Sequence, residues 1–220
     1  VTATIKNRFK NKITLISGIA ATYECADDLY TAGADSILVG IGAGSICTTR
    51  IMTGCGIPGF DSLLRVSKAA KKHKKTFMPD AGIKNSGDIV KALAAGASAI
   101  VAGSIFAGTD ECPGEVVEIN GKKYKKYNGS ASFEEKTNQV TRDSSDKTKH
   151  YTIHIEGVES LVNYRGPVST VIESLLAGVK SGLSYVGARN IPELWKKAEF
   201  ITITPAGIRE NNAEDVIIRT

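Results

Sequence analysis

One thiol lies among hydroxyl groups in a glycine-rich segment. Within residues 39–56, VGIGAGSICTTRIMTGCG, the residues Gly40, Gly42 and Gly44 alternate and lead to Cys47. A thiolate is a strong nucleophile, and a nearby cation, here Arg50, lowers the pKa of a cysteine. Glycines let the backbone turn its amides and carbonyls toward a ligand. The segment therefore predicts a nucleophilic cysteine in a ligand-binding loop, and the alternative is a phosphate-turn loop that encloses a buried cysteine.

Short apolar runs alternate with helical segments around this loop. Strands are expected at residues 13–16, 36–41, 76–78 and 99–106, and helices at 1–12, 22–32, 61–73 and 86–95. Continuous apolar runs of this length, separated by helices, are typical of parallel strands covered by helices. The first half of the chain is therefore predicted to be an α/β structure.

Polar or glycine residues follow the end of each expected strand. Ser17 and Gly18 follow the first, the cysteine loop the second, Asp80 and Gly82 the third, and the Gly103-Ser104 pair closes the fourth. Ligands of βα folds bind at the carboxyl ends of the strands. The pattern therefore predicts one active face that carries all of these residues.

The second half has a different character. Residues 115–127 read as a hairpin with its turn at Asn120-Gly121. Residues 133–149 are polar with almost no apolar side chain, so they are expected to be mobile or disordered. Two helices, at 167–181 and 192–198, and a short strand at 200–204 are expected to complete the chain.

Composition narrows the class of protein. The 220 residues carry a net charge of +5 and 42% hydrophobic residues, which suits a globular protein with a sizeable core. The lysine clusters lack interleaved aromatics, so nucleic-acid binding is not expected. The four cysteines form no Cys-x-x-Cys pair, and no apolar span is long enough for a membrane helix. A reducing cytoplasm is the simplest setting, with no zinc site of that kind and no membrane.

Several motifs extend this interpretation. The string GIGAGSICTTR resembles the cysteine loop of the IMP dehydrogenase and GMP reductase family, which usually reads GIGPGSICTTR. PDAGI, AGSIFAGTDECPGE, KKYNGSAS, SGLSYVGA and AGIRENNAEDV resemble further segments of that family. The resemblance implies a (β/α)8 TIM barrel, of which this chain supplies roughly strands 5–8 at residues 1–114, a hairpin and mobile flap at 115–165, and a C-terminal barrel helix and tail at 166–220. The other half-barrel is expected in the same or another chain.

The resemblance also implies residue roles. Cys47 would attack C2 of the purine nucleotide, Thr49 would assist the second step, and Arg142 would activate water. The ribose and the purine N1 edge would be held by Asp80 and Glu156. The 5′-phosphate and its surroundings would be held by Ser45, Gly82, Gly103, Ser104, Tyr127 and Gly129. NAD or NADP would pass near Gly40 and Gly42. A monovalent cation such as K⁺ would bind at Gly42, Gly44 and Cys47 together with Glu210, Asn211 and Asn212 of a neighbouring subunit of a homo-tetramer.

Three departures from the family pattern keep alternatives open. The family's Gly-Asn-Val is here Gly18-Ile19-Ala20, its Met-Gly-Ser is Ser130-Ala131-Ser132, and its Arg-Tyr pair is Arg142-Asp143. An arginine beside a carboxylate is a poorer base. The leading interpretation is oxidation of IMP to XMP with NAD and water. The alternatives are reduction of GMP to IMP and ammonia with NADPH, and a catalytically inactive nucleotide-binding subunit.

Overall fold

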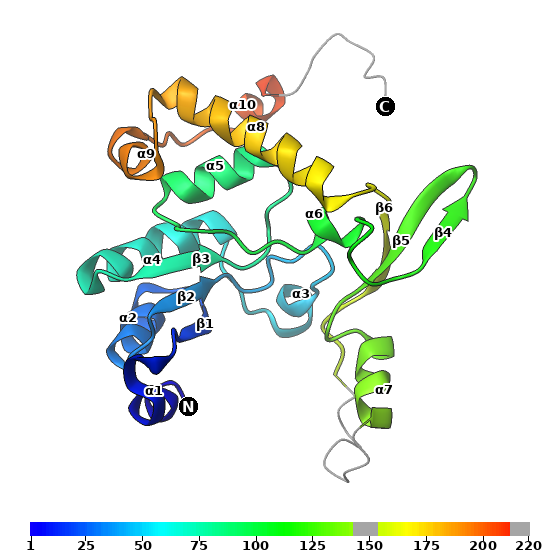
Figure 1. The fold of residues 1–220 in the computed structure, drawn as a ribbon, viewed down its shortest axis with the longest axis horizontal. Helices are drawn as coiled ribbons and strands as arrows, with labels where there is room; N and C mark the ends of the chain where they lie inside the picture. Colours follow the sequence, from blue (N-terminus) through cyan, green and yellow to red (C-terminus); the bar gives the residue numbers. More distant parts are fainter. Residues whose placement is uncertain (143–153, 212–220) are drawn as a thin grey trace.

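The computed structural model describes residues 1–142 and 154–211, and two parts of different architecture make up the fold (Figure 1). The N-terminal part contains α1 (Thr2–Phe9), η1 (Lys10–Lys12), β1 (Ile16–Ala20), α2 (Tyr23–Thr31), β2 (Ser36–Val39), α3 (Thr49–Thr53), α4 (Gly59–His73), β3 (Thr76–Pro79), α5 (Ser86–Ala94) and α6 (Ser104–Ala107). The C-terminal part contains β4 (Val116–Ile119), β5 (Lys122–Asn128), α7 (Phe133–Arg142), β6 (Glu159–Asn163), α8 (Val168–Val186), α9 (Ile191–Lys197) and α10 (Pro205–Glu210).

Three parallel strands in the order β1-β2-β3 form the first sheet, as the apolar runs predict. Ile37 of β2 and Phe77 of β3 are buried against Val66 of α4, so the sheet and its helices share one core. Leu194 of α9 extends that core toward α5 and α8. The sequence ranges for α2, α4 and α5 are confirmed to within two residues. The Thr22 hydroxyl caps α2 by accepting the Cys25 amide.

The first strand lies further along the chain than predicted. Residues 13–16 were expected to pair, but β1 begins at Ile16. The Leu15 carbonyl accepts the amides of Asp35 and Ser36, and the Leu15 amide donates to the Asp35 carboxylate. Leu15 therefore contacts the first residue of β2 through its carbonyl while Asp35 occupies its amide, and the regular register begins with Ile16 opposite Ser36.

The expected fourth strand at 99–106 is wrong. Val101 forms only an isolated parallel bridge with Asp80, and the following SIFA run is helix α6. A short apolar run does not by itself distinguish a strand from a helical turn. The segment still continues the parallel arrangement, because the Val101 amide donates to the Pro79 carbonyl and the Val101 carbonyl accepts the Ala81 amide.

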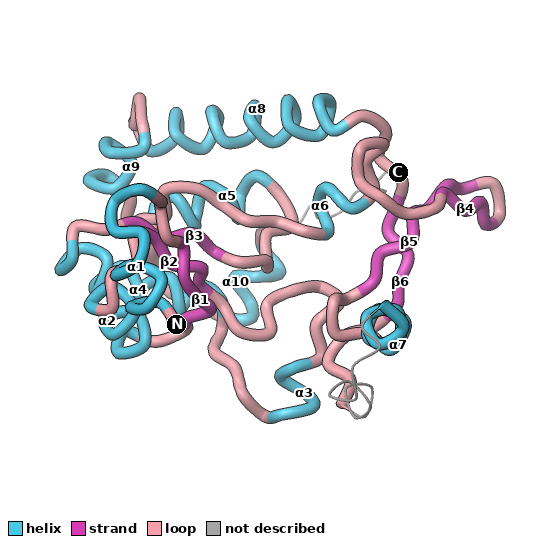
Figure 2. Tube along the Cα trace, turned by 60° about the horizontal axis from the view of Figure 1, so that its bottom comes forward, coloured by secondary structure: helices cyan, strands magenta, loops and turns pink. Residues whose placement is uncertain are grey.

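The C-terminal part contains a three-stranded antiparallel sheet in the order β4-β5-β6, which projects away from the parallel sheet in both views (Figures 1 and 2). The hairpin is confirmed, and Asn120 and Gly121 both have positive φ, as a type I′ turn requires. The strand β6 was missed by the sequence interpretation. The mobile segment expected at 133–149 is wrong for 133–142, which form α7, and its remainder lies outside the described residues.

The C-terminal elements also differ from expectation. The helix predicted at 167–181 runs on to Val186, and Gly187 ends it in the left-handed conformation. The strand predicted at 200–204 is wrong, because this segment has no strand pairing and leads into α10.

Candidate functional site

The cysteine loop, residues 40–50, leaves the end of β2 and is joined to the segment that precedes β6. The Thr48 amide donates to the Glu156 carbonyl at 2.9 Å, and the Val158 amide donates to the Ile46 carbonyl at 3.0 Å. Cys47 thereby forms an antiparallel bridge with Gly157. Two segments far apart in the sequence are thus held together around the thiol.

Four side chains form a continuous row at this junction. Cys47 Sγ lies 3.1 Å from Thr49 Oγ1, which donates to Glu156 Oε2 at 2.5 Å. The other carboxylate oxygen, Oε1, lies 2.8 Å from His154 Nε2. Because Thr49 gives its proton to Glu156, its oxygen is free to accept the Cys47 S–H. The row can therefore carry a proton between the thiol and a carboxylate.

The charge of Glu156 follows from the same contacts. The Thr49 hydroxyl is the main reason that its pKa is lowered from the ordinary value, and His154 and the positive charge of Lys136 act in the same direction. Lys136 is buried at the base of α7 and donates to the His154 carbonyl. Glu156 is therefore held ionised near neutral pH, the state in which a carboxylate can accept a proton.

Arg50 supports the loop rather than the thiol. Its Nε donates to the Ile41 carbonyl at 2.9 Å, and its terminal nitrogen donates to the Ile57 carbonyl at 2.7 Å. A Cβ on Gly42 or on Gly56 would lie 2.6 Å from Arg50 Cγ. The sequence suggested a cation that activates Cys47, but the guanidinium instead joins the start of the cysteine loop to the segment that follows α3.

Asp80 and Gly82 lie against the cysteine loop, as the strand-end pattern predicts. The Asp80 amide donates to the Val39 carbonyl, and Ala81 turns the chain with a φ of 68°. A Cβ on Gly82 would lie 3.4 Å from the Cβ of Ala43. Burial raises the pKa of the Asp80 carboxyl from its ordinary value.

Tyr127 and Gly129 extend the group from the antiparallel sheet. A Cβ on Gly103 would overlap the Tyr127 hydroxyl, so this ring reaches the N-terminal end of α6. Gly129 is buried, and its amide donates to the Val158 carbonyl. Burial raises the pKa of Tyr127.

A cavity of about 350 Å³ opens beside this group. Two of the predicted phosphate ligands, Ser45 of the cysteine loop and Ser104 of α6, lie in its wall. The cavity therefore lies between the cysteine loop and the start of α6.

Gly40 and Gly42 belong to the cysteine loop itself. A Cβ on Gly40 would lie 3.1 Å from the Asp80 carbonyl oxygen, so Gly40, like Gly42, already has a packing reason to be glycine. Other predicted residues are not brought to this junction. Glu210 and Asn211 lie at the end of α10, which is apart from α3 in both views (Figures 1 and 2). Asn212 lies outside the described residues. Arg142 ends α7, and the neighbouring Asp143 also lies outside them.

His154 and Lys136 were missed from the sequence. His154 and Glu156 are two positions apart in an extended segment, a spacing that places both side chains on one face. The sequence alone could have indicated that His154 and Glu156 share a face. It could not have indicated the contact between Glu156 and Thr49, because these residues are 107 positions apart.

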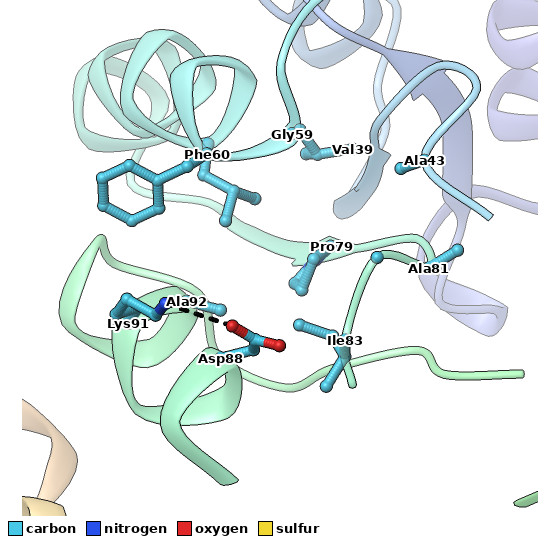
Figure 3. A pocket seen from close by; sticks show the side chains of 12 residues that line it. Val39, Ala43, Gly59, Phe60, Pro79, Ala81, Ile83, Asp88, Lys91 and Ala92 are labelled. Atoms are coloured by element: carbon cyan, nitrogen blue, oxygen red, sulfur yellow. Dashed lines mark ion pairs between the residues drawn. The ribbon is translucent and has the colours of Figure 1, made fainter. Parts of the chain in front are cut away.

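A smaller cavity of about 130 Å³ lies behind the Ala81 turn, between α4 and α5 (Figure 3). Its wall is largely apolar, and an ion pair between Asp88 and Lys91 lies on one side. None of the reactive row lines it, so it is not the candidate active site.

The described ranges hold neither a cluster of metal-ligating side chains nor a membrane-spanning helix. Residues 1–142 and 154–211 contain no group of three or more His, Cys, Asp or Glu side chains that could hold a metal ion. None of the helices in those ranges is long and apolar enough to cross a membrane.

Comparison with known proteins places these features in a family. The profile of the IMP dehydrogenase / GMP reductase domain matches residues 1–214. Inosine-5′-monophosphate dehydrogenase of Methanocaldococcus jannaschii is 45% identical over 214 residues, which are 94% of this chain and 43% of the relative. The enzyme of Chlorobaculum parvum is 44% identical over 222 residues, 98% of this chain and 44% of the relative.

A solved structure gives the same result for the fold. The crystal structure of a GMP reductase variant from Trypanosoma brucei, in complex with guanosine 5′-monophosphate, matches with a TM-score of 0.89 and 34% identity. The match covers 98% of this chain and 45% of that one, so the expectation that the chain forms part of a larger α/β barrel is confirmed. The chain spans about 43–45% of the length of these relatives. The motifs, the fold and the sequence matches agree: this chain belongs to the IMP dehydrogenase / GMP reductase family.

Proposed function

We propose that the protein containing this chain is a purine-nucleotide oxidoreductase that oxidises IMP to XMP with NAD and water. The row from Cys47 through Thr49 to Glu156 is the observation that carries this proposal. It combines a nucleophile with a proton path that ends in an ionised carboxylate. The curated relatives named above, which are IMP dehydrogenases, support the choice of substrate.

The proposed first step is attack of the Cys47 sulfur on C2 of the purine. A sulfur–carbon bond forms, the thiol proton passes to the Thr49 oxygen and on to Glu156, and a hydride leaves C2. NAD would supply the oxidant that takes this hydride. The thiol must lose one proton in this step. The contacts of Thr49 Oγ1 with Cys47 Sγ at 3.1 Å and with Glu156 Oε2 at 2.5 Å give that proton a route.

The second step releases the product by hydrolysis. Water adds to C2 as it loses a proton, the sulfur–carbon bond breaks, and Cys47 leaves as thiolate. Between the two steps Glu156 releases to solvent the proton that it took from the thiol, which its lowered pKa favours. The ionised carboxylate and Thr49 then receive the water proton and return it to the Cys47 thiolate. We also propose that Arg142 contributes to this step and that Glu156 faces the purine N1 edge.

Nucleotide binding is proposed for the residues around the cysteine loop. Asp80 would accept hydrogen bonds from the two ribose hydroxyls. The phosphate would be bound by residues near the larger cavity and the Ala81 turn: Ser45, Gly82, Gly103, Ser104, Tyr127 and Gly129. The nicotinamide dinucleotide would pass near Gly40 and Gly42.

GMP reduction is the second candidate. The structural relative from Trypanosoma brucei is a GMP reductase with bound GMP, and Ser130-Ala131-Ser132 resembles some reductases. The same Thr49–Glu156 pair could donate a proton to departing ammonia, and no activated water is needed. NADPH would then supply the hydride.

Partners are also proposed. Ile16 and Ile19 of β1 expose about half of their surface although they belong to a parallel sheet, which is normally covered on both faces. A further half-barrel, in the same or another chain, would cover them. Assembly as a homo-tetramer would bring Glu210, Asn211 and Asn212 of one subunit to the carbonyls of Gly42, Gly44 and Cys47 of the next, around a cation such as K⁺.

The test is nicotinamide absorbance with two substrate pairs. The purified protein that contains this chain is incubated with IMP and NAD, and separately with GMP and NADPH. A rise in absorbance with formation of XMP supports the dehydrogenase, and a fall with release of ammonia supports the reductase. Nucleotide binding without turnover would instead indicate an inactive subunit, the third alternative.

A further inference from the structure

A cavity of about 190 Å³ lies at the amino-terminal end of β3, whereas Asp80 follows the other end of that strand. The last turns of α4 and α5 and the helix α9 contribute to its wall. In both views this end of the molecule is opposite the antiparallel sheet (Figures 1 and 2). The polar and aromatic residues of the wall are Ser67, Lys71, Lys74, Lys75, Phe77 and Trp195. The cavity is therefore separate from the cysteine loop and the candidate active site.

Two of the three lysines in this wall have no carboxylate partner. Lys75 Nζ lies 2.8 Å from Asp35 Oδ1, and the other oxygen of that carboxylate pairs with Lys6. Within the described residues, no salt bridge joins a carboxylate to Lys71 or Lys74. No carboxylate lines the cavity either. Like charges that share a cavity repel each other, so a bound anion would relieve this repulsion.

The carboxylates of the neighbouring elements do not reach these two lysines. Asp27 of α2 and Glu193 of α9 pair with basic side chains that are not part of the wall. Glu199, which follows α9, does not line the cavity. The charges of Lys71 and Lys74 therefore remain available to a ligand.

Trp195 gives the cavity a fixed aromatic wall. Its Nε1 donates to the Leu93 carbonyl at 2.8 Å, and the residue still exposes 45% of its surface. The cation–π contacts among the described residues involve the rings of Phe9, Tyr23 and Tyr164, so no cation lies on the face of this indole. A planar group can therefore stack on a ring that is already held in place, which reduces the entropy lost on binding.

We propose that this cavity binds a planar ring that carries several negative charges, the chemistry of a nucleoside polyphosphate. Lys71 and Lys74 would contact the phosphates, and the base would stack on Trp195. A pocket that encloses a drug-sized ligand measures about 300–1,000 Å³, so this cavity encloses only part of such a molecule. We therefore expect weak binding that salt reduces further, because exposed charges are screened.

A single aromatic platform also distinguishes between two kinds of ligand. Proteins that bind single-stranded nucleic acid stack successive bases on several aromatic side chains. Here one indole adjoins two free lysines, which favours one nucleotide over a strand. The inference goes beyond the proposed function, since no residue of the cavity belongs to the row from Cys47 to Glu156.

Tryptophan fluorescence tests the proposal, because Trp195 is the only tryptophan in this chain. The protein that contains the chain is titrated with ATP in the presence of saturating IMP, which keeps ATP out of the candidate active site. The signal of the Trp195→Phe variant is subtracted, so that the difference reports on Trp195 alone. We expect saturable quenching as the base stacks on the indole. Inorganic tripolyphosphate, which has the charges but no ring, should displace ATP and reverse the quenching.

Substitutions of the two lysines provide the second arm of the test. The Lys71→Gln/Lys74→Gln double variant is expected to bind ATP about tenfold or more weakly, since hydrogen bonds to charged groups are lost. The Lys71→Arg/Lys74→Arg variant should keep most of the affinity. Lys68→Gln is the matched control, because Lys68 is exposed on α4 but does not line the cavity.

Three results would overturn the proposal. They are the absence of quenching by ATP, equal ATP affinity in the wild type and the double glutamine variant, and tighter binding of a single-stranded oligonucleotide than of ATP. Turnover with IMP and NAD should be the same in the double variant and in the wild type. A wild type without turnover would therefore count against the proposed function and would leave the fluorescence result unaffected.

Discussion

Replacement of Thr49 by valine tests the proton path most specifically. Valine keeps the size and the branching of threonine but removes the oxygen that lies 3.1 Å from Cys47 Sγ and 2.5 Å from Glu156 Oε2. General acid–base catalysis by one positioned group contributes about 10²–10⁴-fold to a rate. The hydrogen bond to the carboxylate is charge-assisted and also helps to place Glu156. We therefore expect kcat to fall by about 100-fold or more.

The assay compares turnover with thiol labelling. Nicotinamide absorbance measures turnover, and peptide mass spectrometry measures alkylation of Cys47 by a small haloacetamide. Turnover should fall sharply in Thr49→Val, while Cys47 remains open to the reagent. Thr48→Val is the matched control, because Thr48 contacts Glu156 through its backbone amide, which the substitution keeps. Unchanged turnover in Thr49→Val would refute the proton path.

Three further predictions concern charge and backbone. His154→Gln should move the acid limb of the pH–rate profile to higher pH, because His154 helps to lower the pKa of Glu156. Glu156 is lost as a proton acceptor when the pH falls through that pKa. An acid limb that does not shift would show that His154 does not act on Glu156. Asp35→Asn should lower the free energy of unfolding at pH 7 by about 1 kcal/mol in urea titrations, since two lysines and a backbone amide hold this carboxylate. The pKa of Asp35 is lowered in the folded protein, so its contribution to stability is present above the unfolded pKa of about 4 and disappears as the pH falls below it. A difference in unfolding free energy between the wild type and Asp35→Asn that stays constant down to pH 2 would contradict this assignment. Gly42→Ala should cost about 1–3 kcal/mol in the same titration, because φ is +66° and the new Cβ would lie 2.6 Å from Arg50 Cγ; a neutral effect would show that the loop rearranges easily.

Local signals explain what the sequence predicts well. The Thr22 cap, the glycine after α2 and the apolar stripe of α4 each arise within one turn of helix, so these helices are recognisable from the sequence. The Asn120-Gly121 turn predicts its hairpin for the same reason. The position of Asp80 after β3 followed from the rule that sites lie at the carboxyl ends of parallel strands.

Long-range contacts explain what the sequence misses. Strand β6 forms because it pairs with β5 over more than thirty intervening positions, and nothing in its own residues indicates that partner. The register of β1 depends on Asp35, which occupies the amide of Leu15. Arg50 appeared to be an activator of Cys47 from its proximity in sequence, but the carbonyls of Ile41 and Ile57 occupy its guanidinium.

Covalent labelling of Cys47 tests the central claim most directly. A 2-halopurine nucleoside 5′-monophosphate is incubated with the protein that contains this chain, and the sulfur would displace the halide at C2. Peptide mass spectrometry should find the nucleotide on Cys47, excess IMP should protect the thiol, and the exposed Cys25 and Cys55 should remain unmodified. Modification of Cys25 or Cys55 at the same rate as Cys47, without protection by IMP, would contradict the account of Cys47 as the nucleophile of a purine-nucleotide site.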